Sequence, residues 1–323
     1  MTKAAAPTWP LVAFCSLIAV IAVRAVSFTH LQLQEASFET VAKPAAGMLP
    51  QWALLLLRLL TFALVVFSLQ SSLRDRTPHK FTSVVWPGSK LQPVSMMVQG
   101  FARLSTFTVQ CWVLQGVYFG LASGITMWQM LGLPSDGRVA WLVAATSWFA
   151  FEVSLPCAIL TTAIVTFVLV PMRARAKDWT TIRLLLLWRP QLMHNANLVF
   201  MVNELLFGSI SARDEHFWIV LLWGLHYVLV SWFWLRRSSL VYYPFLDPTL
   251  PWPRAIGLHL ALLVALRVIF VVGVLISHSA QSLPIMVKVP LLYGAACSIM
   301  HTRFIRGLPR EATDEHGPIS SSE

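Results

Sequence analysis

Residues 51–72 read QWALLLLRLLTFALVVFSLQSS and contain a single charged side chain, that of Arg58. A helix of about 20 apolar residues is long enough to cross the hydrocarbon core of a bilayer. Seven further stretches qualify or nearly qualify by the same criterion. We therefore predict an all-α fold, a polytopic membrane helix bundle with about eight transmembrane helices. Their expected positions are residues 9–28, 51–72, 104–132, 139–171, 190–211, 216–236, 255–277 and 284–301.

The composition of the whole chain agrees with this assignment. Of its 323 residues, 57% are hydrophobic and only 12% are charged, and the mean hydropathy is +0.67. A soluble domain has about a quarter charged residues, so too few remain here to cover an aqueous surface. This excludes an ordinary soluble globule and a disordered chain. We expect a single membrane domain over residues 1–303 and a polar cytoplasmic tail over residues 304–323.

The formal net charge of +10 is explained by membrane topology and does not require a nucleic-acid partner. The basic residues lie in short patches between apolar runs, and such patches mark the cytoplasmic loops of membrane proteins. With both termini in the cytoplasm, three basic residues fall in opposite-side loops (Lys43, Arg138 and Arg213). Seventeen fall on the cytoplasmic side: Lys3, Arg74, Arg76, Lys80, Lys90, Arg103, Arg173, Arg175, Lys177, Arg183, Arg189, Arg236, Arg237, Arg254, Arg303, Arg306 and Arg310.

Several ionisable residues fall within the expected spans, where an unpaired charge is costly. Arg24, Arg58, Arg267 and Lys288 are expected to pair with a neighbour or to extend to the membrane surface. Glu152 is expected to pair with one of the arginines. These residues are therefore interpreted first as structural.

Thr108 and His194 are the candidates for chemistry. Each lies about one turn inside a span, the third and the fifth, and each enters from the cytoplasmic side. A histidine near a hydroxyl can take its proton and make it a nucleophile. The structural alternatives stay open, because a membrane threonine usually bonds a carbonyl one turn earlier and a lone histidine is usually a packing residue.

Polar neighbours could support such a pair. Asn195 and Asn197 flank the histidine and are candidate stabilisers of an oxyanion. Glu204 lies ten residues after His194, which is about 15 Å along a helix, so it could orient polar groups in a shared cavity without touching the histidine. No cofactor is expected, and no metal site, because none of the four cysteines has metal-ligand spacing.

Four features of residues 108–247 resemble the androgen-induced protein family (the FAR-type family). Pro156 precedes His194 by 38 residues, and a Met193–His194 pair is followed by Glu204. The other two are a threonine seven residues before a Gln-x-Val-aromatic-Phe-Gly run and a Tyr-Pro-Phe-Leu-acid motif. They are carried here by Thr108, Gln115, Val117, Tyr118, Phe119, Gly120, Tyr243, Pro244, Phe245, Leu246 and Asp247.

The resemblance, which extends over about residues 104–277, implies a function. Members of that family are multi-span threonine hydrolases of fatty acid esters of hydroxy fatty acids. By resemblance Thr108 and His194 would be catalytic, the partner an acyl-lipid substrate and the location the endoplasmic reticulum. Thr61, within RLLTF, is a second candidate nucleophile, ranked lower because it lies near mid-membrane in a span of opposite direction.

The sequence also departs from the family pattern. It has an extra expected span at each end. Leu192 stands where the family has a second histidine, and Arg236 and Arg237 replace a histidine pair before the tyrosine motif. These changes leave the candidate nucleophile and base in place but leave the substrate open.

Three functions are therefore compatible with the sequence. The first is an intramembrane lipid ester hydrolase with Thr108 as nucleophile and His194 as base. The second is a membrane-bound O-acyltransferase of the wax-synthase type, which would transfer the acyl group to an alcohol. The third is a non-enzymatic carrier or scaffold, with Arg24, Arg58, Arg267, Glu152 and Glu204 lining a polar path.

Overall fold

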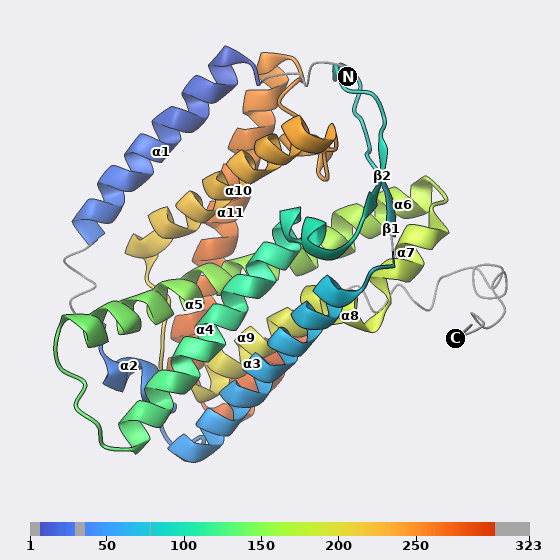
Figure 1. Cartoon of the computed structure of the whole chain (residues 1–323). Helices are drawn as coiled ribbons and strands as arrows, with labels where there is room; N and C mark the ends of the chain where they lie inside the picture. Colours follow the sequence, from blue (N-terminus) through green and yellow to red (C-terminus); the bar gives the residue numbers. More distant parts are fainter. Residues whose placement is uncertain (1–6, 30–35, 78, 301–323) are drawn as a thin grey trace, which may run out of the picture.

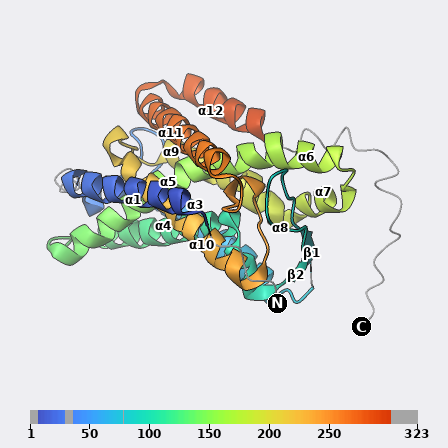
Figure 2. The ribbon, with the colours of Figure 1, turned by 90° about the horizontal axis from the view of Figure 1, so that it is seen from above.

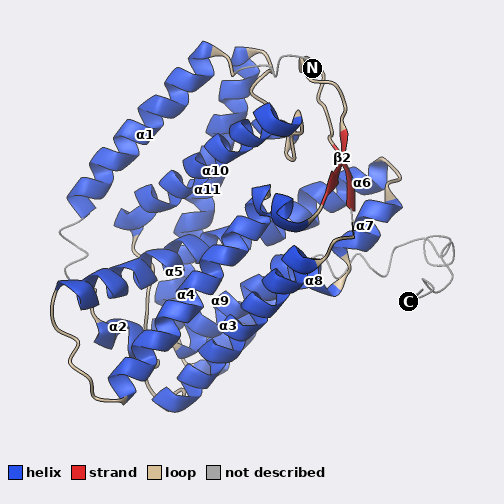
Figure 3. Ribbon diagram, viewed as in Figure 1, coloured by secondary structure: helices blue, strands red, loops and turns tan. Residues whose placement is uncertain are grey.

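The computed structural model describes residues 7–29, 36–77 and 79–300, and Lys3 and the tail expected at 304–323 lie outside them. Helices make up most of this part of the chain, with one pair of strands (Figure 3). A helix occupies each of the eight apolar stretches. The helices are α1 (Trp9–Thr29), α2 (Phe38–Ala42), α3 (Gln51–Arg74), α4 (Phe107–Met130), α5 (Arg138–Ile164), α6 (Val170–Arg175), α7 (Trp179–Leu185), α8 (Trp188–Gln191), α9 (Asn197–Phe207), α10 (Phe217–Ser238), α11 (Trp252–Ser282) and α12 (Ile285–Ile299).

Within the described residues, four helices are long and apolar enough to cross a membrane: Gln51–Arg74, Arg138–Arg175, Asp214–Ser238 and Trp252–Ser282. The second of these is α5 continued through a π-helical segment, Val165–Leu169, into α6. The apolar parts of α1 and α12 are shorter, Trp9–Ala25 and Ile285–Ile299. The chain is thus a helical protein with the dimensions of a membrane bundle, and the expected number of eight spans is not confirmed.

Helix α4 lies at the centre of the bundle, between α3 and α5 (Figure 1). Gly116 and Gly120 face α3, where an added Cβ would lie 2.9 Å from Val65 Cγ1 and 3.0 Å from Phe62 Cε2. Glycines four residues apart let two helices approach closely, which strengthens van der Waals packing where lipid removes the hydrophobic drive. This close approach packs the middle of α4 against α3.

The connections at one end of the bundle, named the hairpin end, surround the antiparallel strands β1 (His79–Thr82) and β2 (Ser95–Val98). His79 pairs with Val98 and Thr82 with Ser95. Both views place the hairpin beside α6 and α7 (Figures 1 and 2), and Arg173 donates to the Thr82 carbonyl at 3.4 Å. The sequence did not predict this hairpin. The described basic loops expected on the cytoplasmic side, 74–103, 173–189 and 236–254, all lie at this end.

The connections at the opposite end, named the α2 end, meet around α2. Pro44 forms an isolated bridge with Gly208, and Gln281 Nε2 donates to the Ser209 carbonyl at 2.9 Å. The chain therefore runs back and forth between the hairpin end and the α2 end. The basic residues expected outside the cytoplasm lie in or next to connections at the α2 end: Lys43, Arg138 and Arg213.

Arg58 and Glu204 form a buried ion pair near the α2 end, with side chains 0% and 1% exposed. The guanidinium Nε donates to Glu204 Oε2 at 3.1 Å, and Nη1 donates to Thr126 Oγ1 at 2.6 Å and to the Val41 carbonyl at 3.0 Å. The pair therefore joins α2, α3, α4 and α9. This confirms that Arg58 pairs with a neighbour. Glu204 is that neighbour, and not a residue that orients polar groups beside His194 as expected.

Glu152 does not pair with an arginine side chain as expected. Its carboxylate contacts Nδ1 of His216 at 2.6 Å and accepts the backbone N–H of Arg213 at 2.8 Å, and both ionisable side chains are fully buried. Arg267 pairs with Asp214 at 2.7 Å on the surface. The partners of Glu152 and Arg267 come from residues 213–216, at the beginning of the helix that continues as α10, and hydropathy alone does not position them.

Candidate functional site

A cavity of about 480 Å³ opens at the hairpin end, and both Thr108 and His194 line it. The two residues come from α4 and from the segment between α8 and α9, which is in contact with both α4 and α5. Both side chains are half-buried. Residues 86 positions apart in the chain therefore contribute to one cavity, which equal depth in the sequence could not establish.

Thr108 belongs to the first turn of α4. The carbonyl four residues earlier, that of Leu104, precedes the helix and accepts the side-chain amide of Gln110 at 3.0 Å. Thr108 instead lines the cavity together with Tyr243. By contrast, Thr61 lies within α3 and donates to its own helix at the Leu57 carbonyl, 2.9 Å away.

His194 lies in a π-helical turn, Leu192–Ala196, inserted between α8 and α9. Single π turns widen a helix locally and frequently occur at functional sites. The Thr162 hydroxyl of α5 donates to the His194 carbonyl at 2.6 Å, which fastens this turn to α5. The backbone beside the histidine is therefore anchored on a neighbouring helix.

The three supporting residues predicted from sequence are not brought to this cavity. Asn195 donates its amide to Gln191 Oε1 at 2.6 Å, and Asn197 donates to Thr161 Oγ1 at 2.9 Å. Glu204 is occupied by Arg58. Among the described residues that line the cavity none of the three is found. Helical spacing placed them near His194 in sequence but could not assign the face on which each lies.

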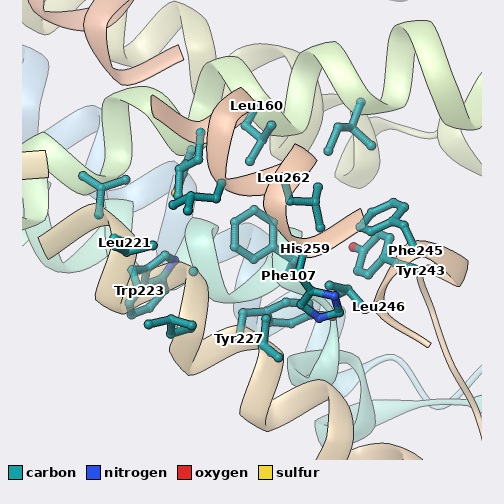
Figure 4. Close-up of a pocket in the computed structure, with 18 of the residues that line it drawn as sticks. Phe107, Leu160, Leu221, Trp223, Tyr227, Tyr243, Phe245, Leu246, His259 and Leu262 are labelled. Carbon is teal, nitrogen blue, oxygen red and sulfur yellow. The ribbon is translucent and has the colours of Figure 1, made fainter. Parts of the chain in front are cut away.

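A second, apolar cavity of about 130 Å³ adjoins the first, and Thr108, Leu169 and Tyr243 line both. Its wall comes mainly from α5, α10, α11 and the tyrosine motif, and the described residues that line it include no charged side chain. Figure 4 shows the aromatic and aliphatic side chains around it, with the Tyr243 oxygen near its edge. Thr108 thus stands where a polar cavity meets an apolar one.

The Tyr243–Pro244–Phe245 motif forms the corner between α10 and α11, and Pro244 begins a 3₁₀ turn, η6 (Pro244–Leu246). Tyr243 and Phe245 stack with ring centroids 5.5 Å apart, and both line the apolar cavity. Burial raises the pKa of Tyr243 to about 12, against a smaller opposing effect of the neighbouring Thr108 side chain. The phenol is therefore protonated at neutral pH and available as a hydrogen-bond donor.

Three arginines contribute to the polar cavity: Arg103, Arg173 and Arg189. Arg103 and Arg189 share the carboxylate of Asp75, and Arg173 pairs with Asp178 at 3.0 Å. Sequence reasoning counted the arginines as topology signals and missed these partners, because the paired residues lie up to 114 positions apart. The opening of the polar cavity, named the basic mouth, is therefore lined by arginines that are paired with Asp75 and Asp178.

Asp75, which pairs with two of these arginines, makes the stability of the fold depend on pH. Burial alone would raise its pKa, but hydrogen bonds from Thr77 and the guanidinium groups of Arg189 and Arg103 outweigh it and hold the pKa well below its usual range. A depressed pKa stabilises the fold above the unfolded value, near 4, and this contribution is lost as pH falls below it.

We therefore expect Asp75→Asn to lower the free energy of unfolding by on the order of 1 kcal/mol at pH 7. The difference in melting temperature from the parent protein should be constant from pH 7 to 5 and narrow below about pH 4. Thermal unfolding in detergent at each pH measures it. A difference that widens on acidification would contradict the assignment.

Within the described residues, no group of three His, Cys, Asp or Glu side chains lies close enough to hold a metal ion. The chemistry available at the cavity is therefore that of a hydroxyl, an imidazole, a phenol and the guanidinium groups. Comparisons with protein-family models, with curated proteins and with solved structures found no match.

Proposed function

We propose that the protein is an intramembrane lipid ester hydrolase in which Thr108 is the nucleophile and His194 the general base. One observation carries the proposal: the two residues line one cavity, and Thr108 also lines the apolar cavity beside it. An acyl chain fits the apolar side, while the ester and its polar end face the basic mouth. This arrangement brings an apolar substrate and a hydroxyl nucleophile together.

The reaction divides into two steps. His194 takes the Thr108 proton as Oγ1 bonds to the acyl carbon, and it then protonates the departing alcohol. A water next attacks the acyl-threonine and gives its proton to His194, and Thr108 regains a proton as the fatty acid leaves. Because Asn195 and Asn197 are occupied elsewhere, we assign the Tyr243 phenol as donor to the developing oxyanion.

The surrounding bundle suits such a substrate. We propose that α1, α4, the α8–α9 segment and α12 cross the membrane together with the four long helices, in eight spans. The hairpin end then faces the cytoplasm with both termini, and the active site opens near that surface. The family resemblance adds fatty acid esters of hydroxy fatty acids as the substrate class and the endoplasmic reticulum as the location.

A labelling experiment tests the nucleophile. The parent protein in membranes should react with a fluorophosphonate probe at Thr108, and peptide mass spectrometry should find the adduct there. Thr108→Ala should lose labelling and hydrolysis of a hydroxy-fatty-acid ester. Thr61→Ala is the matched control, since its hydroxyl is bonded within its own helix, and it should retain both.

The outcomes separate the alternatives. Unchanged hydrolysis by Thr108→Ala together with its loss in Thr61→Ala would transfer the role to Thr61. Acyl-CoA-dependent ester formation that needs Thr108 would favour the O-acyltransferase. The carrier alternative has less support, because Arg58, Glu152, Glu204 and Arg267 are engaged in separate contacts and do not line either cavity.

A further inference from the structure

His259 of α11 lies in the wall of the apolar cavity, with its side chain directed among Phe107, Tyr227 and Leu246 (Figure 4). The residue is 6% exposed. Its Nδ1 lies 2.8 Å from the carbonyl oxygen of Ala255, one turn earlier in the same helix. A carbonyl only accepts hydrogen bonds, so Nδ1 carries the ring proton and donates it there.

The other ring nitrogen, Nε2, is buried and has no hydrogen-bond partner among the described residues. No charged side chain of the described residues lines this cavity to offset a positive imidazole, and an isolated charge in apolar surroundings is costly. The ring is therefore neutral, and Nε2 presents a lone pair. A buried acceptor without a donor costs free energy that a ligand with an O–H group would recover.

The other polar groups of the cavity do not supply that donor. Tyr227 donates to the Ser105 carbonyl at 3.2 Å, and Thr161 donates to the Cys157 carbonyl at 2.8 Å. Neither Thr108 nor Tyr243 donates to Nε2, since that atom has no partner among the described residues. Trp223 Nε1 is a second buried atom without a partner among the described residues, but it is a donor and would meet a ligand oxygen.

We propose that the apolar cavity binds a lipid alcohol whose hydroxyl donates a hydrogen bond to Nε2 of His259. The apolar wall accepts the chain, and His259 selects for the O–H group. An ester or ether lacks that proton, and an ionised fatty acid would bring a charge to a wall that has no cation. The proposal rests on the proposed function only in its consequence, that the alcohol lies beside Thr108 as a leaving group or acyl acceptor.

Competition for photolabelling tests the proposal independently of catalysis. Membranes containing full-length Thr108→Ala protein are labelled with a long-chain alcohol that carries a diazirine and an alkyne. Unlabelled hexadecanol and hexadecyl methyl ether compete; they share the chain and the oxygen but differ in the O–H donor. Hexadecanol should compete about tenfold better, which corresponds to one neutral hydrogen bond.

Two phenylalanine substitutions assign the effect. In His259→Phe the two ligands should compete equally for photolabelling, because the acceptor is lost while the apolar volume remains. His226→Phe is the matched control, since His226 is exposed on α10 and lies outside the cavity lining, and it should keep the preference. Retained competition by the methyl ether shows that the cavity is intact in either variant.

Two results would overturn the proposal: equal competition by the two ligands in the Thr108→Ala protein, or an unchanged alcohol preference after His259→Phe is added to it. If His259→Phe does not accumulate, His259→Leu is judged by the same criterion. Because binding is measured without Thr108, equal competition by the two ligands while His259 is present refutes this site alone. Failure of the proposed hydrolase appears only in the separate labelling of Thr108.

Discussion

Replacing Glu204 by alanine is expected to cost about 3–5 kcal/mol of unfolding free energy, because it leaves the Arg58 guanidinium buried without a counter-charge. Arg58 is fully buried, and its carboxylate partner comes from a different helix. Proteins are stable by only about 5–15 kcal/mol, so this loss removes a large part of the total. Denaturant or thermal unfolding of the purified protein in detergent measures the change.

Two comparisons identify the cause. The double variant Arg58→Met/Glu204→Leu should recover most of the stability, since a buried pair replaced by apolar residues is often close to neutral. Asp214→Ala breaks the exposed pair with Arg267, 39% and 53% exposed, and should cost less than about 1 kcal/mol. Equal effects of Glu204→Ala and Asp214→Ala would show that burial of Arg58 is not decisive.

The second large effect is expected at His194. If His194 is the general base for Thr108, His194→Ala should lower kcat for a hydroxy-fatty-acid ester by about 10²–10⁴-fold. KM should change little, because the apolar cavity that holds the chain does not include His194. Initial rates over a range of substrate concentrations, measured with equal amounts of folded protein, separate the two constants.

His226→Ala serves as the control for removing an imidazole, because its side chain is exposed and lines neither cavity. It should retain the parent kcat. If His194→Ala instead raised KM and left kcat unchanged, His194 would be a substrate-binding residue. Thr108 would then lack its proposed base.

Much of the fold could be predicted from hydropathy. The stretch expected at 51–72 is helix α3 over Gln51–Arg74, and the one expected at 216–236 is α10 over Phe217–Ser238. Apolar length is a local property, so residues close in the chain suffice to define it. The β1–β2 hairpin and α2 were missed because they lie in polar connections, where no apolar period marks them.

The candidate site was predictable only in part. Thr108 and His194 were paired by equal depth from the same side, and both do line one cavity. Asn195 and Asn197 were chosen by proximity in sequence, but their amides face Gln191 and Thr161. His259 gave no signal, because an acceptor is notable only once its carbonyl partner and its cavity are known.

The sequence by itself determined that this chain is helical, with segments long and apolar enough to cross a membrane, and that its basic residues lie in the connections between them. Both properties depend on apolar length and on charge along the chain. Only the tertiary structure decided which polar groups meet. Glu204 reaches Arg58 across 146 positions, and Glu152 reaches His216 across 64. Such pairings depend on which helix faces pack together, and that is set by shape, through contacts such as Gly116 against Val65.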